Sequence, residues 1–391
     1  MESIVTQQIN KIRDKEQRKA LNAWAAQDFV GSVIAGTGFG KSRIGVLAVN
    51  HILSKVKDGS ALILVPTIQL QDQFRNEFIK WGLDNCLDSV DILCYQSAYK
   101  LQGQHYDIVV CDEIHLGLSH EYRKFFKYNM YDSLLCMTAT LPEEEEYKAL
   151  LKTIAPTVYK ITLDKCVQLG IVSPYTITCI PVTLTADEKV NYKKANNSFV
   201  QWKYMLGQFN AFESAQEIMR NKNATAGDKQ KAVMFYRAIR MRKQIVDFAE
   251  NKINKFTEIY EENKDKKILV FGGANDFTDK LCNSIAPHAM SYHSKKTKKQ
   301  KELALESFKD NSINVLCSTK ALNQGFDVPD ANMGVICGIT SKSLSMIQRV
   351  GRLIRFQENK IGEIIILYVA DSQEEKWLKN AVKSLNNVIW K

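Results

Sequence analysis

The sequence predicts an α/β protein with two successive units, each built on a parallel β-sheet with helices on both faces. The first observation is that short apolar runs recur between segments long enough for a helix, a pattern typical of parallel sheets. The second is that this alternation occurs twice along the chain. A chain of 391 residues also exceeds what one ordinary hydrophobic core fills. We therefore expect domain one at residues 1–163 and domain two at residues 164–391.

The first unit opens with a helical pattern at Ile12–Trp24. The β-branched pair Val33 and Ile34 follows and leads into a glycine-rich loop. Later apolar runs predict four further strands, at Ala61–Val65, Val90–Leu93, Ile108–Cys111 and Leu134–Met137.

The second unit has its own strand-like runs, and these enclose a long segment with helical character. The predicted strands are Tyr175–Thr183, Lys267–Phe271, Met290–Tyr292, Ile313–Cys317, Gly334–Ile336 and Ile364–Val369. We interpret residues 186–264 as a helical insertion in domain two. From Ala232 to Tyr260, apolar residues recur at three- and four-residue steps, which predicts one long amphipathic helix. Its apolar face could bind a partner helix or pack onto its own domain.

The composition is that of a globular protein that works in a cytoplasm. Apolar residues make up 45% of the chain and charged residues 25%. The longest apolar runs are too short to span a bilayer, and the first residues lack the pattern of a secretory signal, so no membrane association is expected. The nine cysteines occur singly and several lie in apolar runs, which indicates reduced core thiols. The six histidines are scattered, so the sequence predicts no zinc site.

The net charge of +10 favours a polyanionic partner without identifying it. A basic surface that serves only solubility is the alternative. Other residues have to decide between the two.

A phosphate-binding loop is predicted at residues 33–42, which read V-I-A-G-T-G-F-G-K-S. Glycine lets the backbone approach a polyphosphate closely with several N–H groups pointing at its oxygens, and the following helix adds its positive N-terminal end. Lys41 is expected to reach the β- and γ-phosphates, and the Ser42 hydroxyl to ligate Mg²⁺. The alternative is an ordinary glycine-rich turn before a helix. The predicted nucleotide contacts here are Gly36, Thr37, Gly38, Gly40, Lys41 and Ser42.

Two acids end a predicted strand at residues 108–115, which read I-V-V-C-D-E-I-H. Beside a phosphate loop, Asp112 can hold Mg²⁺ while Glu113 faces the γ-phosphate and activates the attacking water. The next strand ends in M-T-A-T-L-P, where Thr138 and Thr140 could hydrogen-bond the acidic loop and relay its state. The alternatives are a solvent-facing acid pair and simple strand-end capping.

Near the end of the chain, residues 348–355 read Q-R-V-G-R-L-I-R. Arg352 and Arg355 lie three residues apart and therefore on one helical face. Arginines offered from a second domain can stabilise the charge that develops on a transferred γ-phosphoryl group. A plain basic helix face is the alternative.

These segments occur in the order and spacing of motifs I, II, III, V and VI of the superfamily 2 helicases, which the chain therefore resembles. The matching segments are A-G-T-G-F-G-K-S, D-E-I-H, T-A-T, S-T-K-A-L-N-Q-G-F-D at residues 318–327, and Q-R-V-G-R-L-I-R. Within the superfamily, these motifs and G-I-V-S-P-Y at residues 170–175 are most similar to the phage UvsW and XPB branch of DNA helicases and annealing translocases.

The resemblance implies two RecA-like domains, with ATP and Mg²⁺ in the cleft between them and nucleic acid across both. Lys41, Glu113, Gln348, Arg352 and Arg355 would be catalytic, and Asp112 and Ser42 would hold the metal. Gly325 and Asp327 would complete the cleft, and Gln17 resembles the glutamine that reads adenine, although its flanking residues depart from the pattern. His115, Thr138 and Thr140 would couple hydrolysis to movement.

For the nucleic acid, the resemblance assigns phosphate contacts to Pro66 and Thr67 in motif Ia and to Thr319 in motif V. The residues themselves add a lysine-rich loop, which is either a phosphate contact or a solvated charge run. A basic stretch on the long helix, at Arg237, Arg240, Arg242 and Lys243, raises the same question with less weight. The loop lysines are Lys295, Lys296, Lys298, Lys299 and Lys301.

We therefore predict an ATP-dependent nucleic-acid motor that favours DNA, acts on forked or branched substrates and moves from 3′ to 5′. The alternatives are a duplex translocase that remodels or anneals strands, an ATP-gated clamp, an RNA helicase, and the motor subunit of a restriction system. Glu113, Arg352 and Arg355 argue against an inactive motor. The resemblance also suggests a phage origin, hence the cytoplasm of the host, a monomer, and partners in replication or recombination.

Overall fold

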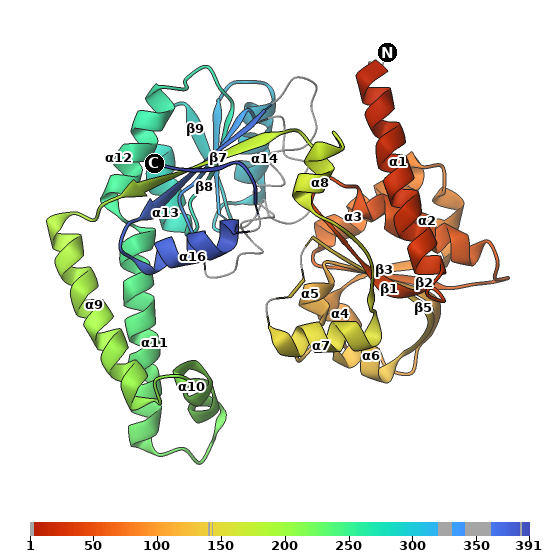
Figure 1. Cartoon of the computed structure of the whole chain (residues 1–391), viewed down its shortest axis with the longest axis horizontal. Helices are drawn as coiled ribbons and strands as arrows, with labels where there is room; N and C mark the ends of the chain where they lie inside the picture. The colour runs from red at the N-terminus through yellow and green to blue at the C-terminus, as the bar shows by residue number, and fades with distance from the viewer. Residues whose placement is uncertain (1–3, 140, 143, 320–330, 341–360, 384) are drawn as a thin grey trace.

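The computed structural model describes residues 4–139, 141–142, 144–319, 331–340, 361–383 and 385–391. These residues form two lobes, each built on a parallel β-sheet, and a helical arm that leaves the second lobe (Figure 1). The predicted α/β fold with two parallel sheets is confirmed. Among the residues that the structure describes, no helix is long and apolar enough to cross a membrane.

The first sheet has six strands in the order β3-β2-β4-β5-β1-β6, and every neighbouring pair is parallel. The five predicted strands are all present. The sixth, β6, lies at the sheet edge and is mostly not buried, so its sequence lacks the apolar run that marked the others. The strands are β1 (Val30–Ala35), β2 (Ala61–Val65), β3 (Val90–Cys94), β4 (His105–Asp112), β5 (Met130–Thr138) and β6 (Thr157–Ile161).

Helices cover both faces of the first sheet because successive strand residues point to opposite sides. One face packs on α1 (Ile4–Ala25), α2 (Lys41–Leu53) and α3 (Ile68–Lys80). The other face packs on α4 (Tyr95–Ala98), α5 (Ile114–Gly117), α6 (Lys124–Tyr128) and α7 (Glu145–Ile154). The indole of Trp24 in α1 is buried and donates to the carbonyl of Leu134 at 3.0 Å, which fixes α1 to the sheet. A 3-10 helix at Asp84–Ser89 precedes β3.

The second sheet has seven strands in the order β13-β7-β12-β11-β8-β10-β9, again with all pairs parallel. Six of them were predicted, and the three-residue edge strand β13 was not. The strands are β7 (Tyr175–Val182), β8 (Ile268–Phe271), β9 (Ala289–Tyr292), β10 (Val315–Ser318), β11 (Met333–Ile336), β12 (Gly362–Val369) and β13 (Val388–Trp390). Residues 162–174, with α8 (Leu163–Gln168), join the two sheets.

The second sheet is also covered on both faces. One face packs on α12 (Glu250–Glu261) and α13 (Asn275–Asn283), and the other on α14 (Lys298–Lys309) and α16 (Gln373–Val382). A fully buried ion pair ties α12 to α16, because the Lys252 ammonium lies 2.8 Å from the Glu374 carboxylate. The same ammonium donates to the carbonyl of Cys337 at 2.8 Å.

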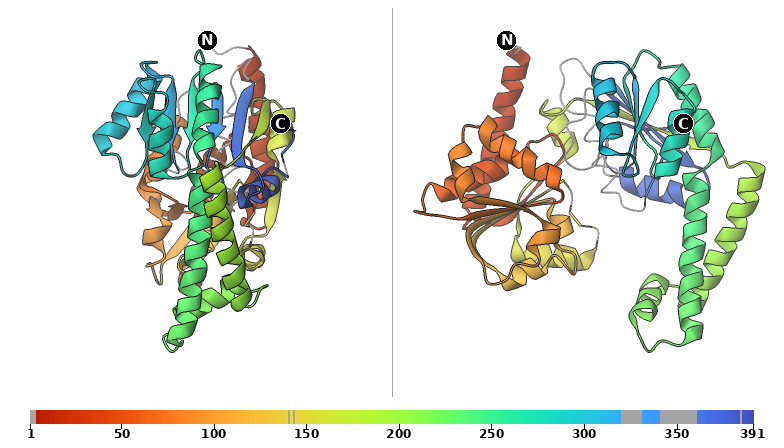
Figure 2. Two further views of the ribbon diagram at one scale, coloured as in Figure 1. Left: turned by 90° about the vertical axis from the view of Figure 1, so that its left-hand side faces the viewer. Right: turned by 180° about the vertical axis from the view of Figure 1, so that it is seen from behind.

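The arm consists of residues 186–247 and projects away from the second lobe (Figures 1 and 2). It contains α9 (Ala186–Met205), α10 (Ala211–Arg220) and α11 (Ala226–Asp247). Thr185 and Glu188 form a capping box that starts α9. The helices pack on a small core of their own around Phe235.

The prediction of one long helix from Ala232 to Tyr260 is wrong. Phe248 and Ala249 interrupt it between α11 and α12. The apolar face is shared among three cores, since Ala232 packs within the arm, Val246 at its root and Phe256 on the second sheet. Helical periodicity was therefore correct for each segment, but the chain turns where its packing partner changes. The domain boundary at residues 163 and 164 stays a prediction.

All nine cysteines are buried and free, as their apolar surroundings in the sequence predicted.

Candidate active site

The predicted phosphate loop joins the carboxyl end of β1 to the first residue of α2. Gly38 and Gly40 have φ values of +87° and +89°, which side chains rarely allow. A Cβ atom at Gly36 would lie 3.2 Å from the Cα atom of Leu163, and one at Gly40 would lie 2.4 Å from Nε2 of Gln17. The positive φ values favour glycine at Gly38 and Gly40, and Gly36 packs closely on the backbone of Leu163. The loop precedes the positive end of a 13-residue helix.

The order of the strands brings the other predicted residues to the same edge of the sheet. Strands β4, β5 and β1 are neighbours, and Thr138 at the end of β5 is in register with Ile34 of β1. Asp112 at the end of β4 is in register with Met137. The phosphate loop, the acid pair and Thr138 thus follow three adjacent strands, where parallel sheets commonly bind ligands.

Lys41 lies between the phosphate loop and the acids. Its ammonium donates to the carbonyl of Ala35 at 3.2 Å and lies 4.0 Å from a carboxylate oxygen of Glu113. The side chains of Lys41 and Glu113 are only 12% and 19% exposed, so little water screens this attraction. Ser42, the second residue of α2, is half-buried.

Glu113, Thr138 and His115 form a compact polar cluster. The Thr138 hydroxyl donates to Oε2 of Glu113 at 3.1 Å. Nδ1 of His115 lies 3.4 Å from the same oxygen and 3.3 Å from the Thr138 hydroxyl. Glu113 has a φ of +49°, a left-handed conformation that is uncommon for a residue with a side chain. The structure thus joins three residues that the sequence assigned to hydrolysis and coupling.

The two neighbouring acids have opposite pKa shifts. Burial, and then the charge of Glu113, raises the pKa of Asp112 to about 7. Burial also opposes ionisation of Glu113, but Lys41 and His115 outweigh it and lower the pKa of Glu113 to about 2. Glu113 is therefore ionised at neutral pH, while Asp112 holds a proton more tightly than an ordinary carboxyl group. Such a split is typical of functional sites.

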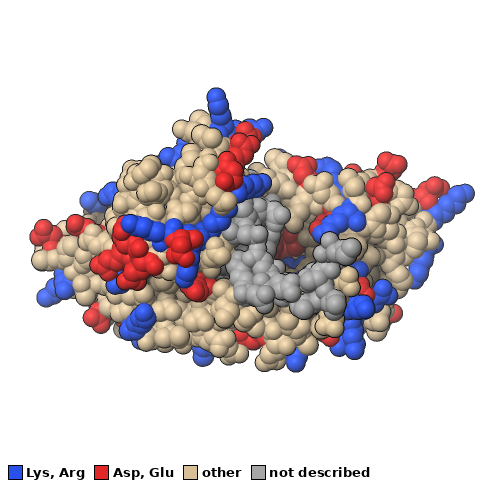
Figure 3. Space-filling model, turned by 90° about the horizontal axis from the view of Figure 1, so that it is seen from above, with Lys and Arg blue, Asp and Glu red and all other residues tan. Residues whose placement is uncertain are grey.

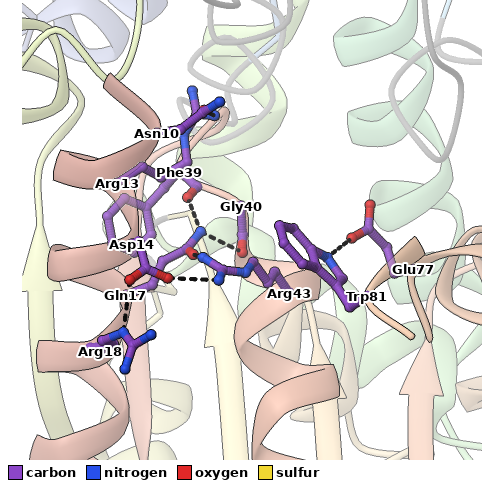
Figure 4. A network of polar contacts seen from close by, with 10 residues as sticks. All are labelled: Asn10, Arg13, Asp14, Gln17, Arg18, Phe39, Gly40, Arg43, Glu77 and Trp81. Atoms are coloured by element: carbon purple, nitrogen blue, oxygen red, sulfur yellow. Dashed lines mark hydrogen bonds and ion pairs between the residues drawn. The ribbon is translucent and has the colours of Figure 1, made fainter. Parts of the chain in front are cut away.

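Gln17 has a set of partners that the sequence did not predict (Figure 4). Its side chain is buried, and its amide nitrogen donates to the carbonyls of Phe39 at 2.8 Å and Gly40 at 3.3 Å. Its amide oxygen accepts from Arg43. Since both polar atoms of Gln17 have protein partners, the side chain clamps the phosphate loop. Its reading of adenine stays a prediction.

Arg43 on α2 connects that clamp to a second residue of α1 and to the end of α3. Its guanidinium donates to Asp14 of α1 at 2.6 Å and lies 4.1 Å from the ring centre of Trp81, the residue that follows α3 (Figure 4). Sequence reasoning missed all three residues. The available signal was the spacing of Asp14 and Gln17, which together with Asn10 and Arg13 form a polar stripe on one face of α1.

The predicted nucleic-acid contacts Pro66 and Thr67 follow β2, next to the acid pair in the sheet. Pro66 is buried, and Thr67 begins α3. The Thr67 hydroxyl is buried and has no hydrogen-bond partner among the described residues. Because buried hydroxyl groups are nearly always paired, this one has an unused hydrogen-bonding capacity.

In the second sheet, Thr319 follows β10 and belongs to a polar chain across three strand ends. Its hydroxyl donates to Asn275, after β8, at 3.2 Å, and Asn275 donates to Ser294, after β9, at 3.2 Å. Sequence reasoning missed Asn275 and Ser294. Their only signal was a polar residue shortly after a buried strand.

The predicted basic loop is partly neutralised by acids, a feature the sequence did not reveal. The ion pairs are Lys295–Asp276 (2.6 Å), Lys296–Asp279 (2.9 Å) and Lys298–Glu302 (3.8 Å). Lys299 and Lys301 have no acidic partner in the described part of the chain. Figure 3 likewise shows basic and acidic side chains interspersed over one face of the molecule. The loop's contact with nucleic acid stays a prediction.

Six predicted site residues lie outside the described residues: Thr140, Gly325, Asp327, Gln348, Arg352 and Arg355.

Comparisons with known proteins identify two family matches and several helicase relatives. Residues 251–357 match the family described as helicase conserved C-terminal domain, and residues 10–143 match the family described as type III restriction enzyme, res subunit. The chain is 26% identical over 371 residues to the DNA 3'-5' translocase XPB2 of Sulfurisphaera tokodaii, covering 91% of this chain and 82% of the relative. It is 24% identical over 384 residues to the pre-mRNA-splicing ATP-dependent RNA helicase PRP28 of Saccharomyces cerevisiae, covering 91% of this chain but only 58% of the relative.

A solved structure supports the fold independently. The S. cerevisiae protein Dbp5 bound to RNA and ADP BeF3 has a TM-score of 0.62 and 16% identity, with 96% of this chain and 89% of that chain covered. The predicted RecA-like fold is thereby confirmed. Each half of the chain thus has its own family match. These matches indicate a superfamily 2 helicase or translocase, and the chain resembles the XPB type.

Proposed function

We propose that the chain is a DNA motor that couples ATP hydrolysis at the edge of the first sheet to movement along a strand. The observation that carries the proposal is the cluster of Lys41, Glu113, Thr138 and His115 beside a glycine loop that excludes side chains. The preference for DNA is supported by the similarity to a relative whose name describes a DNA translocase.

The residues at this edge fit Mg²⁺. Asp112 is buried next to the ionised carboxylate of Glu113, and burial together with that charge raises its pKa and disfavours its ionised form. A divalent cation would offset that effect, and oxygen donors are the ligands that Mg²⁺ prefers. We infer that Asp112 and Ser42 hold the ion. When bound, it would neutralise charge on the phosphate oxygens.

Glu113 would position and deprotonate the attacking water. Its ionised state at neutral pH suits a general base, although a pKa of about 2 makes it a weak one. Lys41 holds that pKa down from 4.0 Å, so any movement of the ammonium away from the carboxylate strengthens the base. Arg352 and Arg355 would supply positive charge from the second domain.

His115 and Thr138 would report the state of Glu113 to the rest of the motor. Lys41 approaches Oε1 of Glu113, whereas Thr138 and His115 contact the other carboxylate oxygen, Oε2. A shift of the carboxylate toward a water molecule would lengthen these contacts. That gives hydrolysis a mechanical connection to the end of β5.

The nucleic acid would be held by its backbone at the strand ends of both sheets. Thr67 offers a hydroxyl with unused hydrogen-bonding capacity, and Thr319 lies at the corresponding edge of the second sheet. Contacts to phosphates carry little sequence information, so binding should depend on structure more than on sequence. With this goes the expectation of a cytoplasmic location, where ATP and nucleic acid are both available.

The test is the steady-state ATPase rate without polymer and with single-stranded DNA, forked DNA or RNA, using Glu113→Gln as the inactive control. Stimulation by DNA over RNA is expected. Stimulation by RNA alone would contradict the DNA preference, and no stimulation by any polymer would contradict the proposed motor.

A duplex translocase that remodels or anneals strands is the second candidate, because the XPB2 relative is named a translocase and not a helicase. A strand-displacement assay beside an annealing assay separates the two. Displacement of a labelled strand supports the helicase, and annealing without displacement supports the remodeller.

A further inference from the structure

The far end of the arm exposes three aromatic side chains. Phe209, in the turn between α9 and α10, is 93% exposed, Tyr204 near the end of α9 is 75% exposed, and Phe212 on α10 is 54% exposed. Aromatic side chains usually bury most of their area, so three exposed rings within nine residues call for a function. Figures 1 and 2 show that this end of the arm lies away from the second sheet.

The exposed rings stand on a packed support. The edge of Phe212 contacts Phe235 of α11 with ring centres 5.0 Å apart, and Phe235 stacks on Phe199 of α9 at 5.6 Å. Ala211 and Ala215 of α10 are buried in the same small core. The end of the arm is therefore a folded platform that presents the exposed rings, and of these Phe212 also contacts its core.

The arm also carries most of the net charge of the chain. Residues 186–247 contain twelve Lys and Arg and six Asp and Glu, a net charge of +6 out of +10 for the whole chain. Arg237 and Arg240 are exposed on α11 and have no acidic partner among the described residues. Arg242 instead packs over the ring of Phe199 at 4.1 Å.

We propose that the end of the arm binds unpaired nucleotides, whose bases stack on Phe209, Tyr204 and Phe212 while the basic residues of the arm attract their phosphates. Single-stranded nucleic acid is bound by this combination of aromatic platforms and positive charge. An apolar protein partner would also fit exposed rings, but it would not account for a net charge of +6. The inference rests on the proposed function and adds a second grip, remote from the ATP site.

Binding is measured with the full chain and fluorescent oligonucleotides: a single-stranded DNA containing 2-aminopurine, the matching blunt duplex, and a single-stranded RNA. The triple variant Tyr204→Ala, Phe209→Ala, Phe212→Ala should bind the single strands at least about tenfold more weakly, because each stacked base is worth about 1–3 kcal/mol. Its affinity for the blunt duplex should change little. Tyr128→Ala is the matched control, since Tyr128 is an aromatic residue 45% exposed on the first lobe.

Phe209→Leu distinguishes stacking from general apolar contact. The side chain is 93% exposed, so the substitution cannot disturb the core, and leucine keeps an apolar surface without a flat ring. We expect Phe209→Leu to weaken single-strand binding and to reduce the quenching of 2-aminopurine, whereas Phe209→Trp restores both. Weakening of DNA and RNA alike supports a site for unpaired bases of either kind.

The proposal is wrong if Phe209→Leu binds single strands like the unmodified chain, or if the triple variant loses duplex and single strand equally. An unchanged triple variant would point to a protein partner instead. Failure of the proposed function is recognised separately, because it concerns the unmodified chain: its ATPase would respond to no polymer. The arm variants should leave the ATPase rate without polymer unchanged.

Discussion

The carboxyl-terminal edges of the two sheets share an architecture and differ in chemistry. At the first edge, a glycine loop, Lys41 and two buried acids follow adjacent strands. At the second edge, the strands end in neutral side chains such as Thr319 and Asn275, and the nearby lysines are largely paired with acids. The parallel sheet supplies an edge in both lobes, and the residues after each strand decide what that edge can bind.

Even the glycines at the two edges serve different purposes. In the predicted phosphate loop, Gly38 and Gly40 take backbone conformations that side chains avoid. After β8, the chain itself fills the space, because a Cβ atom at Gly338 would lie 2.4 Å from the Cα atom of Gly273. The same residue type thus allows left-handed backbone in the predicted phosphate loop of one lobe and close backbone packing in the other.

The difference between the two sheet edges is tested most strongly by removing a charge from each edge in turn. Lys41→Ala should lower the ATPase rate by a factor of about a hundred to a thousand or more and weaken ATP binding, because it removes the positive charge beside the phosphates. Glu113→Gln should keep ATP and nucleic acid bound but hydrolyse slowly. Lys296→Ala, which removes a lysine from the second edge, is the matched control. Normal turnover in Lys41→Ala or Glu113→Gln would contradict the site.

Buried charge in the second lobe should affect stability instead of catalysis. Lys252→Ala leaves the Glu374 carboxylate buried without its cation, which should cost about 3–5 kcal/mol in the free energy of unfolding. Replacing both, as Lys252→Met with Glu374→Leu, should recover most of that loss. Chemical denaturation measures both variants. If the double variant is as unstable as Lys252→Ala, the ion pair stabilises the fold by more than the neutralisation of its two charges.

The clamp on the phosphate loop gives a smaller effect that separates two roles of Gln17. Gln17→Ala removes two hydrogen bonds to loop carbonyls and should cost about 1–3 kcal/mol in the free energy of unfolding. If the side chain only clamps the loop, binding of ATP and GTP should weaken by the same factor. A selective loss of ATP over GTP would establish the adenine contact. Arg43→Lys, which loses the contact with the Trp81 ring, should reproduce the clamp defect in part.

Thr67 and Thr319 allow the two edges to be compared on nucleic acid. Thr67→Val removes a hydroxyl that has no partner among the described residues, so it should leave stability unchanged and lower nucleic-acid affinity by roughly fivefold, about 1 kcal/mol. Thr319→Val removes a hydroxyl that already donates to Asn275 and should also reduce stability. Equal nucleic-acid affinity for Thr67→Val and the unmodified chain would exclude Thr67 as a contact.

The smallest effect concerns the lysines of the second edge. Lys299 has no acidic partner in the described part of the chain. Lys299→Ala should therefore reduce the slope of log affinity against log salt concentration by about one, the value for one phosphate contact. Lys295→Ala should change that slope less, because Lys295 is already paired with Asp276. Replacing all five lysines from residue 295 to residue 301 should lower affinity and flatten the slope. An unchanged slope would leave the loop as a solvated charge run.

Most of the fold was predictable because its signals are local. Strands such as Ala61–Val65 are continuous apolar runs, since both faces of a parallel sheet are buried. The edge strands β6 and β13 were not predicted, because their exposed residues interrupt the apolar run that marks a strand. The end of α11 at Asp247 was not predicted for another reason. The helical period of the sequence continues past it, and only the change of packing partner ends the helix.

Which residues gather at the edge of the first sheet was likewise predictable, because a glycine-rich loop and a strand-end acid pair are short motifs with their own chemistry. The pKa values of these residues were not predictable from the sequence. Burial raises the pKa of Asp112, whereas at Glu113 the closer contacts of Lys41 on α2 and His115 on α5 outweigh burial and lower the pKa. Two adjacent acids in a sequence are equivalent until their neighbours in space are known.

The sequence by itself determined the two-sheet fold, the glycine loop, the acid pair and the superfamily. Each of these depends on short segments in which residue type and spacing follow directly from a physical requirement. Only the tertiary structure decided that Gln17 holds the phosphate loop, that Arg43 joins it to Trp81, and that the arm presents Phe209 to solvent. It also decided that most of the basic loop is paired. These features depend on which distant residues meet, and contacts between residues far apart in the chain leave no periodic trace in either partner.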